Sequence, residues 1–355
     1  MKFNKNLLFI FILSFIFFVM VPKYNIKTNA SSSTSEIVIE INSNRILHQV
    51  NAFEKKYMAS TTKILTAITI IENCNLDDVV TVTKETVGVE GSSIYLEVGE
   101  KLTVKHLLYG LMLRSGNDCA ETLAIHCSKS IEKFSKLMNE TARKIGANES
   151  NFVNPHGLHD DNHYTTAYDL AIISSYALKN PTFREIVSTK KITIPHTTRG
   201  YERVLINKNK MLNEFEGSTG IKTGYTKKAG RCLVSSCYRD GMELVCVVLN
   251  CPPMFERSKT LLSECFNDYK LYKILESDNI VGFSKFNDIK IPLVVKNDIL
   301  LPLSDNEIKG IKTVYEYPES INKPINKDTE IGFVKIFSEN NLIFQEKIYT
   351  IIDVE

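Results

Sequence analysis

The chain has 355 residues, and 43% hydrophobic with 24% charged residues is the composition of an ordinary globular protein. This length allows a large core and more than one domain. The formal net charge of +2 gives no reason to expect a nucleic-acid partner or a polybasic membrane patch. Eight cysteines are present, but none of their spacings is the C-x-x-C of a metal or redox site, and we expect free thiols.

Residues 1–30 have the pattern of an export signal. Lys2 and Lys5 precede an apolar run over residues 7–21, and small residues at 28–30 suit a cleavage site. The apolar run is short for a helix that crosses a membrane. We therefore expect a cleaved signal peptide and an exported, extracytoplasmic protein. In the alternative, the segment stays uncleaved as an anchor, and this is the only membrane association that we expect.

Two strands are expected directly after this segment. Residues 36–41 alternate in polarity, residues 42–44 form a turn, and residues 45–50 return as a second strand. Residues 60–73 predict a helix, because isoleucines recur on one of its sides. Ser60 stands at the start of this helix, where free backbone N–H groups can bind an oxyanion.

The middle of the chain is predicted to be helical. Thr103 is a typical N-cap, and it begins a helix that runs to Leu113 and leads into a loop at residues 115–117. Further helices are expected over residues 118–127, over residues 131–145 with Gly146 at the end, and over residues 166–178, stopped by Asn180-Pro181.

From about residue 220 the pattern becomes that of strands. Residues 220–226 alternate in polarity, and residues 231–238 and 242–249 form a hairpin around a turn at 239–241. Residues 257–269 return to a helix. Strands at both ends with helices between them predict an α/β (α+β) fold in which helices cover an antiparallel sheet.

The character of the chain changes near its C-terminal end. Residues 289–295, 299–303 and 331–336 form short strand patterns separated by Asn, Asp, Lys and Pro turns. We therefore predict a larger domain over residues 31–277 and a small all-β domain over residues 278–355.

Three separated motifs carry the chemistry: Ser60-Thr61-Thr62-Lys63, Ser115-Gly116-Asn117 and Lys222-Thr223-Gly224. A lysine three residues after a serine shares its helix face and can act as its base. Each motif alone has a simpler interpretation, as a helix N-cap, a helix-ending turn or a polar turn before a hairpin. Ser-x-x-Lys also occurs at Ser130 and Ser188, so only the ordered trio indicates an acyl-serine enzyme.

In these motifs the chain resembles the penicillin-binding, active-site-serine D,D-peptidases, and most of all the low-molecular-mass, serine-type D-alanyl-D-alanine carboxypeptidases of the peptidase S11-like family. The resemblance covers about residues 35–275 and is carried by residues 59–67, 102–118, 154–158, 164–171 and 220–226. It implies a β-lactamase/transpeptidase-like catalytic domain over residues 31–277 and no cofactor. It also implies a peptidoglycan stem peptide ending in D-Ala-D-Ala as substrate, and β-lactam antibiotics as covalent inhibitors.

The resemblance also implies a role for each catalytic residue. Ser60 would attack the carbonyl group between the two D-alanines and form an acyl-enzyme, with Lys63 as general base. Lys222, a second cation close by, would lower the pKa of Lys63 together with burial. Ser115 would pass the proton to the departing D-alanine, and water would then hydrolyse the acyl-enzyme.

The remaining motif residues would bind the substrate. Asn117 would hold the side-chain amide of the acyl group, and Lys222 with Thr223 would bind the terminal carboxylate. Gly224 would leave room for the substrate backbone along the strand. The backbone N–H groups of Tyr225 and of the nucleophile would form the oxyanion hole.

A histidine cluster offers a different chemistry. His156, His159 and His163 lie close together beside two aspartates, and zinc D,D-peptidases exist. Their spacing fits neither H-E-x-x-H nor a helix face, since Gly157 breaks the local helix. We therefore predict a polar loop near the cleft and no metal site.

Two other functions remain open. A class A β-lactamase of the same fold would need a deacylating glutamate in a Glu-x-x-Leu-Asn stretch, and none lies between Asn117 and Lys222. A non-catalytic receptor for wall peptides or β-lactams has no need of a nucleophile beside its base, as in Ser60 and Lys63. We therefore expect a hydrolase that removes the terminal D-alanine from stem pentapeptides.

Overall fold

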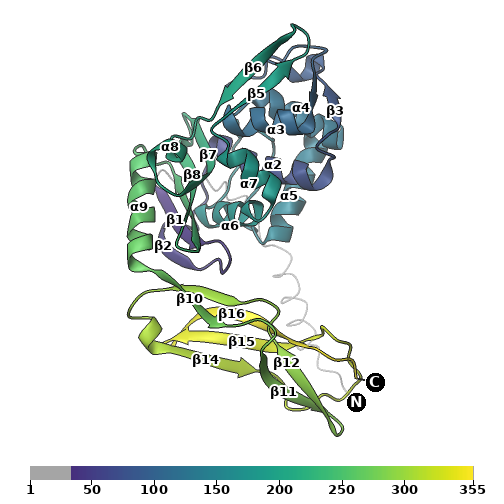
Figure 1. Cartoon of the computed structure of the whole chain (residues 1–355). Coiled ribbons are helices and arrows are strands. Elements are labelled where there is room, and N and C mark those ends of the chain that lie inside the picture. The colour runs from purple at the N-terminus through teal and green to yellow at the C-terminus, as the bar shows by residue number, and fades with distance from the viewer. Residues whose placement is uncertain (1–32, 355) are drawn as a thin grey trace, which may run out of the picture.

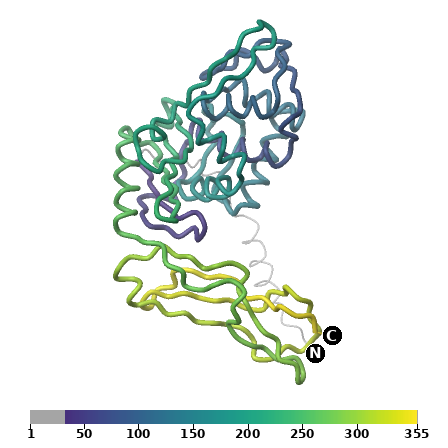
Figure 2. The backbone as a smooth tube through the Cα atoms, viewed as in Figure 1, coloured from purple at the N-terminus to yellow at the C-terminus, as the bar shows by residue number. Residues whose placement is uncertain are grey.

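The computed structural model describes residues 33–354, and the predicted signal segment, residues 1–30, lies outside the described residues. Figures 1 and 2 show a helix-rich part above and a part built of strands below. The long helix α9 (Met254–Asp268) descends along the upper part and leads into β10 (Lys270–Leu275) of the lower one.

The upper part is organised around one antiparallel sheet of five strands. From edge to edge these are β2 (Ile46–Val50), β1 (Ser35–Glu40), β9 (Met242–Leu249), β8 (Gly230–Arg239) and β7 (Ser218–Thr226). Every residue of β9 is buried, as expected for a central strand covered on both faces. The N-terminal strand β1 pairs with β9, so the two ends of this part meet in one sheet.

Helices cover both faces of this sheet. Val245 and Val247 of β9 point into the larger hydrophobic core, whereas Leu244 and Cys246 point into a smaller core under α9. This alternation is the period of two expected of a strand between two layers. The larger core is formed with α2 (Lys63–Asn73), α3 (Val104–Leu113), α4 (Asn117–Ser128), α5 (Ile131–Ile145), α6 (Ala167–Leu178) and α7 (Pro181–Ser188).

Several helix ends follow directly from the local sequence. Thr103 caps α3 by accepting a hydrogen bond of 3.1 Å from the backbone N–H of His106. Ser130 caps α5 in the same way, which explains the Ser-x-x-Lys pattern at that position as a structural one. Gly146 ends α5 in the left-handed conformation, with φ of 99°.

Two local predictions differ from the structure. Asn180-Pro181 does not only stop α6 but begins α7, because Asn180 caps it and proline is tolerated in a first helical turn. Asn117 is not on a loop but is the first residue of α4. The hairpin of β5 (Lys191–His196) and β6 (Tyr201–Ile206), at the top of Figure 1, was not predicted.

The lower part has its own hydrophobic core, separate from the two above. Strand β10 pairs with β13 (Ile299–Leu303), so pairing in this part begins before the predicted boundary at residues 277/278. A five-stranded antiparallel sheet completes it, in the order β11 (Ile280–Phe286), β12 (Ile289–Val294), β16 (Asn341–Thr350), β15 (Glu330–Ser338) and β14 (Ile311–Glu316).

The two parts are tied together at their junction. The guanidinium of Arg45 donates to the carbonyl of Pro302 and to the carboxylate of Glu307.

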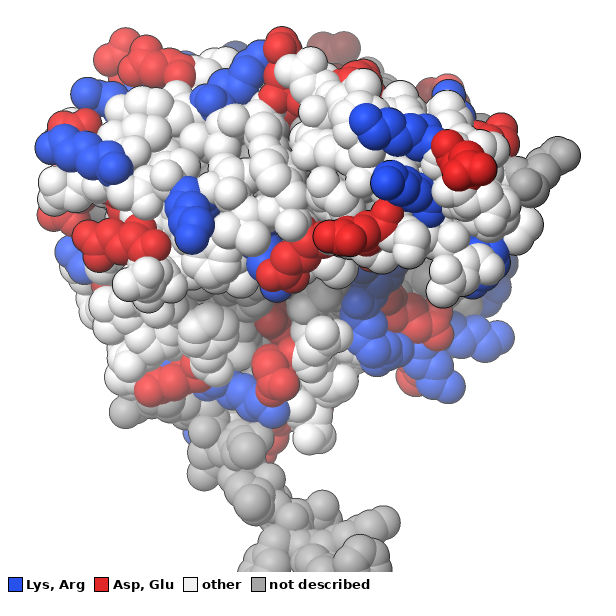
Figure 3. Space-filling view, turned by 90° about the horizontal axis from the view of Figure 1, so that it is seen from below, with Lys and Arg blue, Asp and Glu red and all other residues white. Residues whose placement is uncertain are grey.

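The underside of the molecule carries interspersed positive and negative side chains (Figure 3). Within residues 33–354, none of the helices combines the length and the apolar character that a membrane span requires.

Candidate active site

The first motif forms a tight turn at the beginning of α2. Ala59 to Thr62 form a short 3-10 helix, and Ala59 is buried with a positive φ of 49°. The hydroxyl of Thr61 donates to the carbonyl of Met58 at 2.7 Å, and that of Thr62 donates to the carbonyl of Ala59 at 2.9 Å. These bonds hold the backbone on both sides of Ser60.

Lys63 is buried directly behind this serine. Its Nζ lies 3.1 Å from Oγ of Ser60, 2.7 Å from Oδ1 of Asn117 and 2.6 Å from the carbonyl oxygen of His156. Its exposed fraction is 0%, so these three oxygens replace water around the amine. The spacing of three residues predicted from the sequence therefore places amine and hydroxyl in hydrogen-bond contact.

Burial decides the protonation of this amine. The pKa of Lys63 lies well below its usual value, first because the charged form is desolvated and second because Lys222 is close by. Burial also lowers the pKa of Lys222 to about 7, with a further contribution from Lys208. A neutral Lys63 beside Ser60 is able to accept the proton of the serine hydroxyl.

The second motif lies in the turn between α3 and α4. Ser115 has a positive φ of 64°, and its Oγ is buried with no hydrogen-bond partner within the described part of the chain. Asn117 is held at both ends of its side-chain amide, because Oδ1 accepts from Lys63 and Nδ2 donates to the carbonyl of Glu90 at 2.5 Å. An Oγ without a partner is available to a bound substrate.

The third motif lies on β7, the edge strand of the sheet. A Cβ atom added to Gly224 would lie 3.0 Å from the carbonyl oxygen of Met58 and 3.1 Å from the backbone nitrogen of Ser60. Lys222 is 1% exposed, and its Nζ donates to the carbonyl of Thr223 at 3.1 Å. The side chain of Tyr225 is exposed.

The structure thus brings the three predicted motifs to one place from α2, the α3–α4 turn and β7. One nearby cation was missed by the sequence analysis. Lys208 is partly buried, donates to Oγ of Ser92 at 3.1 Å, and contributes to the low pKa of both Lys63 and Lys222. It lies in an Asn-Lys-Asn-Lys stretch that has no pattern to distinguish it from an exposed loop.

The ring nitrogens of His156 and His163 contact groups of the protein itself. His163 Nε2 lies 2.7 Å from Oγ1 of Thr62, and its Nδ1 accepts from the backbone N–H of Val153 at 3.1 Å. His156 Nδ1 accepts from the backbone N–H of Leu158, and its Nε2 lies 3.3 Å from Glu121. These ring nitrogens are therefore committed to protein contacts.

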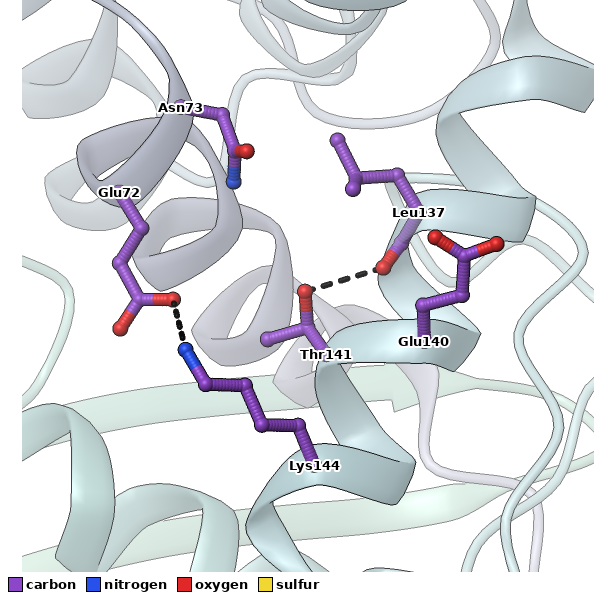
Figure 4. Close-up of a pocket in the computed structure, with 6 residues that line it drawn as sticks. All are labelled: Glu72, Asn73, Leu137, Glu140, Thr141 and Lys144. Carbon is purple, nitrogen blue, oxygen red and sulfur yellow. Dashed lines mark hydrogen bonds and ion pairs between the residues drawn. The ribbon is translucent and has the colours of Figure 1, made fainter.

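Figure 4 shows a pocket elsewhere in the helical part, away from the three motifs. It lies between the C-terminal end of α2 and α5, whereas Lys63 is at the N-terminal end of α2. Glu72 and Lys144 form an ion pair across it at 4.0 Å, and Thr141 donates to the carbonyl of Leu137. None of the predicted site residues lines this pocket.

A family model described as D-alanyl-D-alanine carboxypeptidase matches residues 23–252. The chain belongs to the D-alanyl-D-alanine carboxypeptidase family. A second model, for the C-terminal domain of penicillin-binding protein 5, matches residues 269–355 of this carboxypeptidase. The predicted family and class of enzyme are confirmed.

Individual relatives of this carboxypeptidase agree with the family assignment. D-alanyl-D-alanine carboxypeptidase DacF of Bacillus subtilis strain 168 is 29% identical over 331 residues, which cover 90% of this chain and 85% of DacF. The D-alanyl-D-alanine carboxypeptidase of Streptomyces sp. strain K15 is 36% identical over 57% of this chain and 75% of its own. Penicillin binding protein 5 from Haemophilus influenzae has a TM-score of 0.78 at 25% identity, over 92% of this chain and 97% of its own. The predicted fold, a helix-covered antiparallel sheet followed by a domain of strands, is confirmed.

Proposed function

We propose that this enzyme removes the terminal D-alanine from peptidoglycan stem peptides ending in D-Ala-D-Ala, through an acyl-enzyme on Ser60. The observation that carries the proposal is the contact of 3.1 Å between Oγ of Ser60 and the buried amine of Lys63, whose pKa is strongly lowered. A serine in hydrogen-bond contact with a neutral lysine is an activated nucleophile.

The reaction then follows in two steps. Oγ of Ser60 bonds to the carbonyl carbon of the penultimate D-alanine while its proton passes to Nζ of Lys63. The C–N bond breaks, and the proton taken up by Lys63 passes through Ser115 to the leaving amine, so Lys63 is neutral again. Oγ of Ser115 has no hydrogen-bond partner in the described chain. Water then attacks the ester, with Lys63 as base, and returns the serine hydroxyl.

Substrate binding is assigned to the edge strand and the second motif. The ammonium of Lys222 and the hydroxyl of Thr223 bind the terminal carboxylate, and the substrate lies along β7, where Gly224 has no side chain. The backbone N–H groups of Ser60 and Tyr225 stabilise the oxyanion. Asn117 holds the amide of the acyl group, and β-lactams acylate the same serine.

We propose that the protein acts outside the cytoplasm, where peptidoglycan is. The export signal predicted at residues 1–30 supports that location, and we propose that membrane association would require this segment to remain uncleaved.

The acyl group can be transferred to water or to an amine, and the acceptor is a property to be tested separately. A solved structure that is 31% identical to this chain, with a TM-score of 0.60, is of a Streptomyces K15 DD-transpeptidase variant. In a transpeptidase an amine takes the place of the hydrolytic water. Product analysis should therefore record both released D-alanine and cross-linked peptide.

The test compares wild type with Ser60→Ala and Ser130→Ala. Ser130 also heads a Ser-x-x-Lys pattern but caps α5, so it is a matched control. We expect wild type and Ser130→Ala to release D-alanine from a pentapeptide and to bind fluorescent penicillin stably, and Ser60→Ala to do neither. Release of D-alanine by Ser60→Ala would refute the proposal, and rapid loss of the penicillin label would favour a β-lactamase.

A further inference from the structure

The turn that carries the nucleophile is fixed by a buried hydrogen-bond chain that begins at a histidine. His163 is 2% exposed, and its ring meets that of Phe152 edge-on at a centroid distance of 5.7 Å, which sets the plane of the imidazole. Its Nε2 lies 2.7 Å from Oγ1 of Thr62, which in turn lies 2.9 Å from the carbonyl oxygen of Ala59.

The position of each proton in this hydrogen-bond chain is determined by its donors and acceptors. The backbone N–H of Val153 donates to Nδ1 of His163, so the proton of a neutral ring must be on Nε2. Nε2–H therefore donates to the hydroxyl of Thr62. That hydroxyl then uses its single proton to donate to the carbonyl of Ala59.

The neutral form of the ring is the stable one. Burial, together with the nearby His156, Lys63 and His159, lowers the pKa of His163 to about 3. The ring therefore does not titrate in the range in which the enzyme works, and it acts as a fixed hydrogen-bond donor.

The hydrogen-bond chain ends at a backbone segment with an unfavourable conformation. Ala59 has a positive φ of 49°, a conformation that alanine adopts at a cost, and it directly precedes Ser60. On the other side, Gly157 is so close that an added Cβ would lie 1.9 Å from the carbonyl oxygen of Ala59. The segment that carries Gly157 and His163 therefore encloses the nucleophile turn.

We propose that His163 is a positioning residue for the nucleophile, acting through Thr62 and Ala59 to hold Ser60 in line with Lys63. The inference rests on the proposed function. Because a misplacement of about 1 Å in a reacting group can lower the rate about 100-fold, loss of this donor should lower kcat more than it raises KM.

A matched pair of variants separates the two ends of the ring. In His163→Gln the amide nitrogen takes the place of Nε2 and keeps the bond to Thr62. In His163→Asn the amide oxygen takes the place of Nδ1, so it keeps the bond to Val153 and loses the one to Thr62. We expect His163→Gln to retain kcat within about fivefold, and His163→Asn to lose about 10- to 100-fold in kcat with KM nearly unchanged.

The readouts are kcat and KM for D-alanine release, the rate of acylation by fluorescent penicillin, and thermal unfolding. His196→Asn, a change at another buried histidine in β5, controls for the loss of any buried imidazole and should keep kcat. The pH profile of His163→Gln should superimpose on that of wild type, since a positioning residue does not exchange protons with substrate.

Thr62→Val removes the hydroxyl that accepts from His163. It tests the same hydrogen bond if a His163 variant does not fold. It should lower kcat as His163→Asn does, and the double variant should be no worse than either, since both break one chain. Equal kcat for His163→Gln and His163→Asn, or wild-type kcat for Thr62→Val, would overturn the inference. If wild type is acylated by penicillin but releases no D-alanine, the proposed function is refuted. The acylation rates of the His163 and Thr62 variants would then still test the positioning role.

Discussion

At the scale of single residues, the site depends on two buried lysines with opposite requirements. Lys63 must be neutral to accept a proton, and Lys222 must be charged to bind a carboxylate. Burial is the main cause of the low pKa of both, and the charge of Lys222 adds to the shift of Lys63. The active form is therefore the one in which the proton is on Lys222 and not on Lys63.

This arrangement predicts a bell-shaped dependence of kcat/KM on pH. Activity should rise with pH as Lys63 loses its proton, and it should fall above about pH 7 as Lys222 of the free enzyme loses its own. A bound carboxylate favours charged Lys222, so kcat should fall at a higher pH than kcat/KM. Kinetics from about pH 5 to about pH 10 measure both profiles. A kcat/KM that stays constant across the alkaline half of this range would contradict the assignment of Lys222.

At the scale of secondary-structure elements, two helices carry motif residues at their beginnings and thiols at their ends. α2 begins with Lys63 and is followed by Cys74, and α4 begins with Asn117 and contains Cys127 in its last turn. Interaction with the thiol of Cys74 lowers the pKa of Cys127. By contrast, burial raises the pKa of Cys246 to about 12.

We therefore predict that Cys127 is the thiol most rapidly alkylated by iodoacetamide at neutral pH. It is partly exposed and its pKa is lowered, whereas Cys246 is fully buried and burial raises its pKa. Peptide mapping after short labelling identifies the modified residue. In Cys74→Ala the interaction that lowers the pKa of Cys127 is gone, and labelling of Cys127 should slow. Labelling of Cys246 at a similar rate would show that burial does not protect it.

At the scale of the whole molecule, the chain is built from two parts with separate hydrophobic cores. One combines the sheet β2-β1-β9-β8-β7 with its helices, and the other combines β10 to β16. Between them, the contacts of Arg45 with Pro302 and Glu307 are polar. Parts with separate cores can unfold separately.

Calorimetry should therefore show two unfolding transitions. Covalent penicillin should raise the temperature of only one of them, because a ligand stabilises the part that binds it. The same treatment of Ser60→Ala should change neither transition. A single transition that shifts as a whole with penicillin would mean that the two parts unfold cooperatively.

Local sequence predicted most elements of the fold. Residues 131–145 and 242–249 form α5 and β9 with the predicted bounds, because a capping serine, a C-terminal glycine and a tight turn are local signals. The hairpin of β5 and β6 was missed because its strands pair only with each other and carry a mixed pattern of exposure. Asn180-Pro181 was interpreted as a stop, although the same residues also cap a new helix.

The sequence by itself determined the class of fold, the three motifs and their order, since each of these depends on residue types at short spacings. Only the tertiary structure decided the distances between the motifs, the proximity of Lys208 and the role of His163. These depend on how residues far apart in the chain pack. Packing also decides which amines lose their water, and the loss of water is what moves the pKa of Lys63 and Lys222.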